Sequence, residues 1–528
     1  MFNRRIYCVS NAHLDTQWNW TIQDTIRDCV KNTMDVNFEN IDNTRHYVMN
    51  FEGAFRYKLM REYYPEKYEM LKKYIRDGRW NVAGSFWDSC DVNVPSSEGL
   101  MRQALLGNKY FEEEFGKRSY DIFLPDCFGF RSSIPSIAAH MGIKGFSTQK
   151  LAWGVGTPVI NDDGTTSIPM PGDFNRMDLG KWEGPDGRRI YVSLDAGGYT
   201  YQFDEKENRV TDKEYFYNYT ERNLKNSGYP WHAVYFGTGD YGGGCSLECA
   251  KALDAAVEKE GGLYDVVASS TTQIFEDVEA NGDEALPVYK GPLNIPHGFG
   301  ALTSHTISKR WNRRCELLAD AAERASLVAE LETGKEYPEE RLKEAWKTFL
   351  WHQFHDDLTG TSICEAYTFS HNDYVIALNT FANELGASVE AVASVLDTTG
   401  VGTPVVIYNP TGTKRCDTVT VNLTTSTGYA RVYDEKGNEV PSQVSSDGKS
   451  VIYIANVLPI SFTVYEVRES DSAYSSSLSA SKNTIENERY KVTVDENGDV
   501  SSVYDKEYSR EMLSSPICMQ ISESNSPN

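Results

Sequence analysis

Three short segments of the sequence combine residue types that bind divalent metals or take part in acid–base catalysis. In the first, His13 and Asp15 stand two residues apart, shortly after an apolar run that ends at Ser10. Residues two apart on a strand share a face, so an imidazole and a carboxylate would be presented side by side. Such a pair supplies half of a divalent metal site. The alternative is a hydrogen-bonded pair that only ends a strand.

The second segment places Asp126 directly after an apolar run at residues 122–124. Pro125 and Gly129 flank a turn, and Ser133 opens a helical pattern. The sequence therefore predicts a buried strand that delivers one carboxylate to its carboxyl end. Catalytic groups gather at that edge in parallel α/β folds. The alternative is a structural aspartate that caps the following helix.

The third segment is His355-Asp356-Asp357, which closes a helical pattern just before Gly360. Carboxylates at a helix C-terminus face the negative end of the helix dipole. A positive group such as a metal ion is therefore expected to offset them. A solvated acidic helix end is the alternative.

A fourth candidate, Asp240, lies in a run with five glycines in eight residues, from Gly237 to Gly244. So many glycines indicate a mobile loop or a backbone that approaches a ligand closely. The run has neither a GK[ST] ending nor a GxGxxG frame, which disfavours nucleotide binding. Asp240 would be a second carboxylate at a strand end, and glycoside cleavage needs two.

The elements that must position these residues follow from the pattern of the chain. Residues 1–285 alternate short apolar runs with helical patterns, which predicts an α/β fold with a parallel sheet, and about seven strands favour a β/α barrel. Residues 286–398 predict a three-helix bundle that completes the metal site, and residues 399–470 predict a small β-sandwich. Residues 482–528 contain one hairpin pattern. A lone hairpin cannot bury a face, so we expect the truncated start of a C-terminal β domain.

Composition and charge limit the class of protein. The 528 residues are 40% hydrophobic, which is typical of globular proteins, and the net charge is −24. That charge disfavours nucleic acid and anionic membrane surfaces as partners. The ten cysteines are scattered without CxxC pairs, and no segment resembles a signal core or a membrane span. We therefore expect a cytoplasmic protein. The sequence does not determine the oligomeric state, and a homo-oligomer is one of the possibilities.

Taken together, the three segments resemble the α-mannosidases of glycoside hydrolase family 38 in order and spacing. The resemblance covers most of the chain. Two departures concern the subtype, because Phe354 stands where many relatives have a histidine and Tyr241 replaces a glycine. Further segments that resemble the family are Phe51-Glu-Gly53, Gly78-Arg-Trp80, Asn93–Glu98, Arg102-Gln103, Trp182-Glu-Gly184, Gly239–Gly244, Glu486–Tyr490 and Tyr504-Asp-Lys506.

The resemblance implies a seven-stranded β/α barrel, a helical bundle and β domains. It also implies one Zn²⁺ held by a set of four residues, and two catalytic carboxylates: Asp126 as nucleophile and Asp240 as acid/base. The implied zinc ligands are His13, Asp15, Asp126 and His355. The substrate contacts are expected to be Asp356, Trp18 and Arg102.

We therefore expect a retaining, zinc-dependent exo-α-mannosidase that hydrolyses terminal α-linked mannose from oligosaccharides, glycoconjugates or small mannosides. Retention predicts carboxyl groups about 5–5.5 Å apart. One alternative is a mannosylglycerate-type hydrolase of the same family, in which Arg102 or Lys309 would meet the acid group. The others are a metal-dependent polysaccharide deacetylase, which needs no second carboxylate as acid, and a catalytically silent sugar-binding protein.

Overall fold

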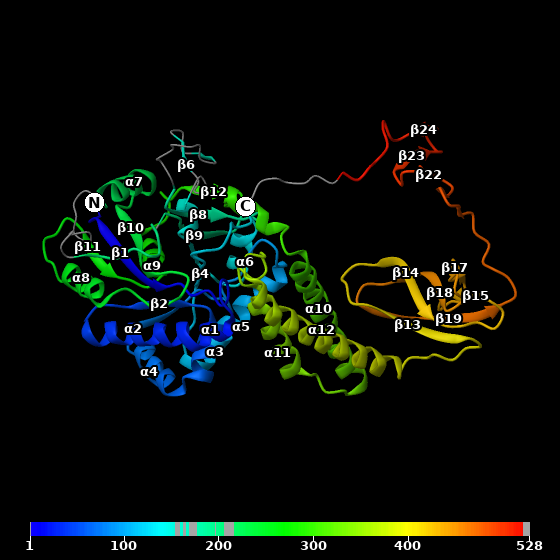
Figure 1. The fold of residues 1–528 in the computed structure, drawn as a ribbon, viewed down its shortest axis with the longest axis horizontal. Helices are drawn as coiled ribbons and strands as arrows, with labels where there is room; N and C mark the ends of the chain where they lie inside the picture. The colour runs from blue at the N-terminus through cyan, green and yellow to red at the C-terminus, as the bar shows by residue number, and fades with distance from the viewer. Residues whose placement is uncertain are drawn as a thin grey trace. The chain divides into compact units, whose positions relative to one another are not determined.

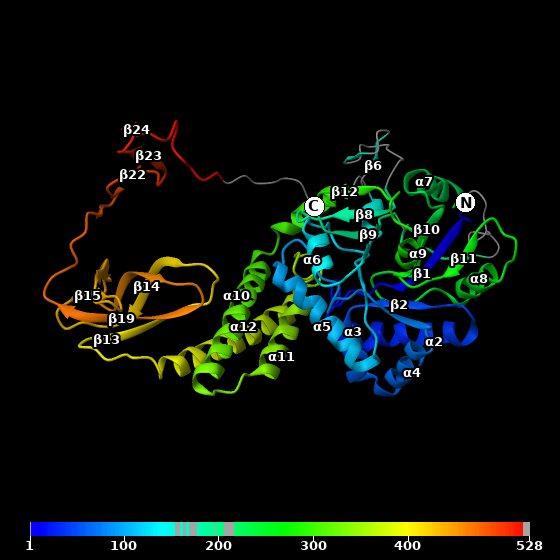
Figure 2. The ribbon, with the colours of Figure 1, turned by 180° about the vertical axis from the view of Figure 1, so that it is seen from behind.

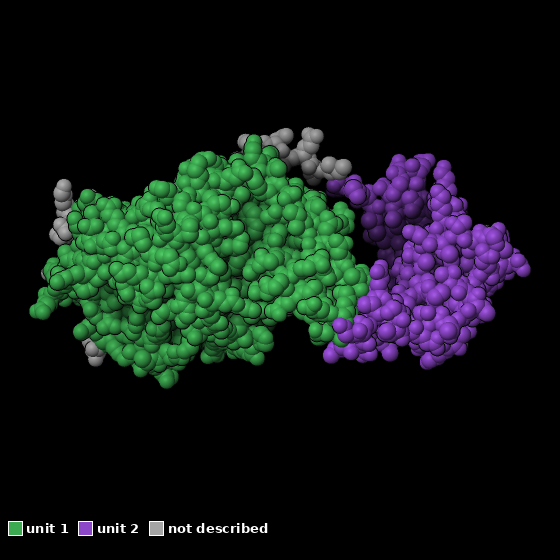
Figure 3. Space-filling view, turned by 90° about the horizontal axis from the view of Figure 1, so that it is seen from below, with its two compact units in different colours: residues 1–330, 335–388 green, residues 331–334, 389–528 purple. Residues whose placement is uncertain are grey.

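The computed structural model describes residues 2–153, 159–161, 165–167, 177–195, 197–204 and 216–520. The chain divides into two compact units (Figure 3). Unit 1 comprises residues 1–330 and 335–388, and unit 2 comprises residues 331–334 and 389–528. None of the described helices is both long and apolar enough to cross a membrane.

Two five-stranded sheets form the centre of unit 1 (Figures 1 and 2). The first is parallel, in the order β10 (Trp231–Thr238), β1 (Arg5–Ala12), β2 (Met49–Glu52) and β3 (Trp80–Ala83), with β11 (Asp265–Ala268) also paired to β1. The second has the order β12 (Val288–Lys290), β8 (Leu179–Glu183), β9 (Arg189–Ser193), β5 (Gly145–Ser147) and β4 (Asp121–Phe123), with all pairs parallel except β8–β9. The predicted parallel α/β core is confirmed.

Helices alternate with these strands along the chain. One of them, α5, begins after Ser96, whose hydroxyl accepts a hydrogen bond from the backbone N–H of Gly99, and ends at Gly116 in the left-handed conformation. The helices between the strands are α2 (Lys31–Asn43), α3 (Ala54–Tyr63), α4 (Pro65–Arg76), α5 (Ser97–Phe115), α6 (Ile134–His140), α7 (Tyr217–Ser227), α8 (Leu247–Val257) and α9 (Gln273–Asn281).

The observed strand pairing differs from the single seven-stranded barrel that the sequence predicts, because β3 and β4 have only four and three residues with which to pair. The two sheets meet there through hydrogen bonds to Asp121. Its carbonyl accepts from the N–H and the hydroxyl of Ser85 (2.9 Å each), and its carboxylate accepts from the N–H of Gly84 (3.2 Å). On the other side, His232 of β10 lies 2.9 Å from Asp178, just before β8. Side chains from both sheets share one buried cluster: Val9, Ala83, Phe123, Tyr199 and Tyr235. Closure into one barrel stays a prediction.

Three long helices follow the sheets in sequence: α10 (Thr306–Thr333), α11 (Glu339–Leu350) and α12 (Cys364–Ala393). They match the three helical patterns in the sequence. The α5 helix contacts them through Gln103, whose side-chain amide donates to the carbonyl of Leu350 (2.8 Å). Because unit 1 continues to residue 388, a separate bundle domain at 286–398 stays a prediction.

Unit 2 is built of antiparallel sheets. One contains β13 (Thr403–Asn409), β19 (Ser461–Ser470), β15 (Tyr429–Tyr433) and β16 (Glu439–Val440), and a second contains β14 (Arg415–Asn422), β18 (Ser450–Val457) and β17 (Ser442–Val444). Val432, Val451 and Tyr465 belong to a buried cluster shared by these two sheets, as in a β-sandwich. The predicted hairpin is confirmed as β22 (Tyr490–Val494) and β23 (Val500–Asp505), although β20 (Ser479–Ala480), β21 (Thr484–Glu486) and β24 (Arg510–Glu511) extend it to five strands.

Candidate active site

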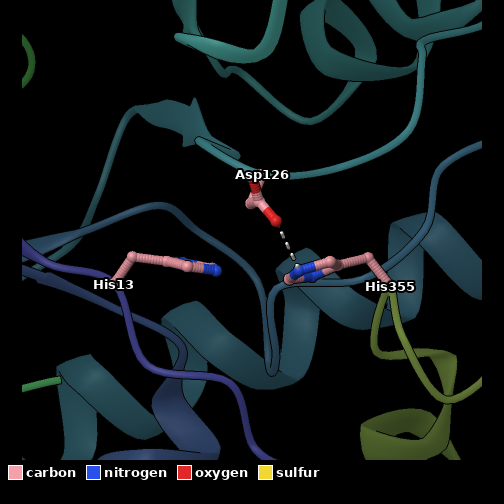
Figure 4. A group of neighbouring side chains, drawn as sticks. All are labelled: His13, Asp126 and His355. Atoms are coloured by element: carbon pink, nitrogen blue, oxygen red, sulfur yellow. Dashed lines mark ion pairs between the residues drawn. The ribbon is translucent and has the colours of Figure 1, made fainter. Parts of the chain in front are cut away.

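Side chains from three distant parts of unit 1 converge beyond the carboxyl ends of its strands. His13 directly follows β1, Asp126 follows β4, and His355 lies five residues after the end of α11. All three are buried, and Figure 4 shows them pointing toward one another. One ligand atom of each lies within 4.8 Å of the other two. The structure therefore brings together three of the four predicted metal ligands in one group.

The fourth predicted ligand, Asp15, belongs to a second group that overlaps the first through His355 and also contains Asp356. Oδ1 of Asp15 lies 3.1 Å from Nε2 of His13 and 3.4 Å from Nε2 of His355. Nε2 of His355 lies 3.8 Å from Oδ2 of Asp126. Two donors bound about 2.1 Å from a tetrahedral ion lie roughly 3.4 Å apart. The His13–Asp15, Asp15–His355 and His355–Asp126 separations are close to that value, as expected of neighbouring ligands of one ion.

Contacts on the outer side of each imidazole direct its Nε2 atom into the cluster. Nδ1 of His13 lies 2.9 Å from Oε1 of Glu52, and Nδ1 of His355 lies 2.9 Å from the carbonyl oxygen of Ser89. Because a carboxylate and a carbonyl accept hydrogen bonds, we assign the proton of each neutral ring to Nδ1. Nε2 of His355 is buried and has no hydrogen-bond partner, which is costly unless it binds a ligand. Metal-bound histidines are oriented in this way.

The electrostatics of the cluster require a positive charge. Burial by itself lowers the pKa of His13, but its hydrogen bonds to Asp15 and Glu52 raise that pKa to about 10. Burial raises the pKa of Asp356 to about 7, and the charges of Asp15 and Asp126 add to the rise. In the absence of a metal ion, bound protons have to balance these carboxylates. The donor set of imidazole nitrogens and carboxylate oxygens is one that Zn²⁺ accepts.

Asp240 is connected to the cluster through Tyr199. Asp240 follows β10 with a φ of 60°, which is unusual outside glycine, and its carbonyl accepts a hydrogen bond from the N–H of Asp15 (2.7 Å). The Tyr199 hydroxyl donates to Oδ1 of Asp240 (2.9 Å) and lies 3.3 Å from Oδ1 of Asp126. The two predicted catalytic carboxylates therefore meet at one buried hydroxyl.

Sequence reasoning missed three residues of the site: Glu52, Lys150 and Tyr199. The ammonium of Lys150 lies 2.5 Å from Oδ1 of Asp126, and both residues are buried. Glu52 falls within a segment that resembles the family, so that resemblance could have indicated it. Lys150 begins the short 3₁₀ helix η2 (Lys150–Trp153) after β5, and Tyr199 lies in a turn after β9. No motif in the sequence distinguishes them.

The two aspartates after His355 differ in their surroundings. Asp356 lies in the cluster, where the Thr361 hydroxyl donates to its Oδ1. Asp357 accepts a hydrogen bond from the Ser370 hydroxyl (2.7 Å) and lies 2.6 Å from Nδ1 of His352. Asp357 is therefore engaged in a buried polar network, and Asp356 is the one that can face a substrate.

The other two predicted substrate contacts, Trp18 and Arg102, have different surroundings in the structure. Trp18 is half-buried, and its carbonyl accepts a hydrogen bond from Ile363 N–H (2.8 Å) in the loop that follows His355. Arg102 instead forms a two-pronged ion pair with Glu323 of α10 (2.6 and 2.8 Å). No described contact links Arg102 to the metal-ligand cluster, so its role in substrate binding has no support here.

Comparisons with known proteins agree with the geometry. A family model described as "Glycosyl hydrolases family 38 N-terminal domain" matches residues 3–292, and one described as "Alpha mannosidase middle domain" matches residues 299–395. The chain is 29% identical over 364 residues to "Alpha-mannosidase G" of Dictyostelium discoideum, covering 69% of this chain and 31% of that protein. It is 29% identical over 360 residues to human "Alpha-mannosidase 2C1", covering 68% of this chain and 32% of that protein. The chain thus spans about a third of the length of these relatives.

The fold is also similar to that of a solved structure. "The crystal structure of an alpha-mannosidase from Enterococcus faecalis V583" superposes with a TM-score of 0.77 at 20% sequence identity. The match covers 96% of this chain and 61% of that chain. At this identity, the match shows a shared fold that includes both units.

Proposed function

The chain belongs to glycosyl hydrolase family 38, and on this premise we propose that it is a retaining, zinc-dependent exo-α-mannosidase. Its substrate would be terminal α-linked mannose in an oligosaccharide, a glycoconjugate or a small mannoside. One observation carries the proposal: His13, Asp126 and His355 converge within 4.8 Å, and Tyr199 connects Asp126 to Asp240. Metal ligands and a pair of carboxylates thus lie in one site.

The metal would be held by His13, Asp15, Asp126 and His355. When bound there, a zinc ion supplies a Lewis acid for two neighbouring sugar hydroxyls, such as the axial 2-OH and the 3-OH of mannose. Asp356 would accept a hydrogen bond from a further hydroxyl. Because the Thr361 hydroxyl already donates to Oδ1 of Asp356, we assign the sugar contact to Oδ2.

The two oxygens of Asp126 have different neighbours, which suits one oxygen to metal binding and the other to nucleophilic attack. Oδ2 is 3.8 Å from Nε2 of His355, on the metal side, whereas Oδ1 lies near Lys150 (2.5 Å) and Tyr199 (3.3 Å). We assign Oδ1 as the atom that attacks the anomeric carbon. The ammonium of Lys150 would balance the charge of Asp126 in this buried site before the attack and when the carboxylate is released.

Asp240 would donate a proton to the leaving oxygen and then accept one from the water that releases mannose from Asp126. Both Oδ1 atoms lie within hydrogen-bonding range of the Tyr199 hydroxyl. Contacts of 2.9 and 3.3 Å limit the distance between those two oxygens to about 6.2 Å, which is compatible with the roughly 5–5.5 Å carboxyl separation of retaining enzymes. This bound supports net retention.

The mannosylglycerate alternative loses its two candidate cations. Lys309 donates to the carbonyl of Leu358 (2.9 Å), and Arg102 is paired with Glu323. Both cations are therefore engaged within the protein and are not free to meet the acid group of such a substrate. An α-mannosidase for neutral glycans is the better match.

The proposal is tested with the purified chain and an aryl α-mannoside, with and without a chelator. We expect hydrolysis, loss of activity with chelator, recovery with Zn²⁺, and α-mannose as the first product seen by NMR. Asp126→Asn should lower turnover by about 10³-fold or more while the protein stays folded. Mannoside binding without turnover would favour a silent sugar-binding protein. Deacetylation that survives Asp240→Ala would favour the deacetylase.

A further inference from the structure

We propose that Tyr241, stacked on Trp20, is the platform on which the leaving-group sugar rests beside Asp240. The platform would bind the ring on the reducing side of the cleaved bond. This inference rests on the proposed mannosidase function and specifies a part of the substrate. Tyr241 belongs to the glycine-rich run Gly237–Gly244 and is paired with the metal-ligand segment His13–Asp15.

The two rings form a fixed stack with one open side. Their centroids are 4.1 Å apart and their planes are inclined by 19°. Trp20 is only 8% exposed, and its indole N–H donates to the Thr25 hydroxyl (2.7 Å). Tyr241 is 58% exposed. Trp20 therefore supports one face of the tyrosine ring, and the ring remains open to solvent, where an apolar ligand face can cover it.

Backbone contacts fix Tyr241 between the metal-ligand segment and the proposed acid. Tyr241 forms an isolated antiparallel bridge with Leu14, which stands between His13 and Asp15. The next residue, Gly242, donates its N–H to the carbonyl of His13 (3.1 Å). Asp240, on the other side, accepts from the N–H of Asp15. The ring is thus held in register with both the metal-ligand cluster and the acid.

The chemistry of cleavage places the leaving group on this side of the site. The acid must reach the glycosidic oxygen, so the sugar attached to that oxygen lies next to Asp240. A pyranose presents an apolar face of C–H groups, and a rigid aromatic ring offers a matching surface at little entropic cost. Tyr241 is the one aromatic residue in the run from Gly237 to Gly244. Trp18, whose ring is 6.0 Å from that of Trp20, extends the aromatic surface.

The competing explanation is that Tyr241 only shields Trp20 from water. The two explanations differ in how they depend on the leaving group. Shielding would affect all substrates alike, because it acts through the fold. A platform affects only substrates whose leaving group has a ring, and it acts on kcat/KM, which reports the steps up to cleavage.

The test compares α-linked mannobiose with α-mannosyl fluoride, whose leaving group has no ring. Tyr241→Ala is expected to lower kcat/KM for mannobiose about 10-fold and to leave the fluoride within about 2-fold of wild type. Tyr241→Phe keeps the ring and should behave as wild type. Tyr63→Ala removes a similarly exposed tyrosine (52%) at the end of α3 and should change neither substrate.

Two outcomes would overturn the platform: an equal fall for both substrates, or no fall for mannobiose. Calorimetric binding in an Asp240→Asn background gives a readout that does not need turnover. There, adding Tyr241→Ala should weaken mannobiose about 10-fold and leave mannose unchanged. A wild-type protein that cleaves neither substrate contradicts the proposed function. Equal mannobiose affinity in the Asp240→Asn variant and in the Asp240→Asn, Tyr241→Ala double variant would also contradict the platform.

Discussion

At the scale of single residues, the metal interpretation depends most on Nε2 of His355. That atom is buried, lacks a hydrogen-bond partner and faces carboxylate oxygens of Asp15 and Asp126. The carbonyl of Ser89 on the opposite side of the ring favours a proton on Nδ1. A lone pair held toward carboxylates is repelled unless a proton or a metal ion lies between them, and the same reasoning applies to His13 with Glu52 behind it.

Glu52→Gln tests whether the residue behind His13 tunes the metal site. A neutral amide accepts the hydrogen bond from Nδ1–H of His13 more weakly than the carboxylate does. The ring is then less basic, and Nε2 donates its electron pair to a metal less strongly. Zinc affinity should fall about 10-fold or more. Competition with a chromophoric chelator measures this without any turnover. Glu98→Gln, an exposed carboxylate on α5, is the control. Equal zinc affinity in Glu52→Gln and wild type would remove Glu52 from the metal site.

Tyr199→Phe tests the hydroxyl shared by the two proposed catalytic carboxylates. Removing it leaves Oδ1 of Asp240 without its 2.9 Å donor and Oδ1 of Asp126 without its 3.3 Å contact. A hydrogen bond to a charged group contributes about 1.5–3 kcal/mol, so kcat on an aryl α-mannoside should fall roughly 10- to 100-fold. Zinc affinity should not change, since Tyr199 is not a ligand. An unchanged kcat would show that the hydroxyl only fills space.

At the scale of elements, the apolar runs indicate seven strands of the two sheets in unit 1, but β2, β8 and β12 are not among them. β2 carries Asn50 and Glu52, which are fully buried yet polar. Asn50 donates to the carbonyl of Ser269, and Glu52 contacts His13. A strand that uses its buried positions for hydrogen bonds lacks the apolar signal on which prediction depends. Tyr199 and Lys150 were unpredictable for a related reason, because only tertiary contacts bring residues of such short connecting segments to the site.

The junction of the two sheets also depends on a polar residue that the sequence does not mark. Asp178 precedes β8, lies 2.9 Å from Nδ1 of His232 in β10, and accepts a hydrogen bond from Asn223 of α7 (2.8 Å). It is fully buried. This carboxylate takes the place of strand pairing on that side of unit 1.

Asp178→Ala should destabilise unit 1 by about 1–3 kcal/mol, because it leaves buried donors of His232 and Asn223 without their acceptor. Urea unfolding followed by tryptophan fluorescence measures this, because all ten tryptophans lie in unit 1. Asp417→Ala, an exposed aspartate on β14 of unit 2, should have no effect on this signal. A loss below about 1 kcal/mol would mean that Asp178 is not needed at the junction.

Because the pKa of Asp178 is lowered in the folded state, the stability of unit 1 should depend on pH in acid. Burial alone would raise the pKa of Asp178, but the hydrogen bond with His232 and the charge of Arg222 hold it well below its usual range. The folded pKa is thus lower than the unfolded value of about 3.9, so the stabilisation is present above about pH 4 and is lost as the pH falls through the folded pKa. Wild type should lose stability in acid more steeply than Asp178→Asn, measured by the same fluorescence signal. Parallel curves would exclude this contribution.

At the scale of the whole molecule, the proposed chemistry belongs to unit 1. The two family models together span residues 3–395 apart from a short gap, whereas unit 1 ends at residue 388. Most of unit 2 lies beyond the two family models, whereas the fold match to the Enterococcus faecalis α-mannosidase covers 96% of the chain. The proposed ligands come from both segments of unit 1: His13, Asp15 and Asp126 from residues 1–330, and His355 from residues 335–388.

Metal removal should therefore lower the stability of unit 1 as a whole. An ion that binds only the folded state stabilises it by about 2.7 kcal/mol when its free concentration is 100 times Kd. Adding a chelator should shift the tryptophan-monitored unfolding midpoint downward, and Zn²⁺ should restore it. His355→Ala, which removes the only proposed ligand from residues 335–388, should abolish the response to Zn²⁺. If the midpoint of wild type is the same with chelator and with Zn²⁺, these residues do not bind a metal that links the two segments.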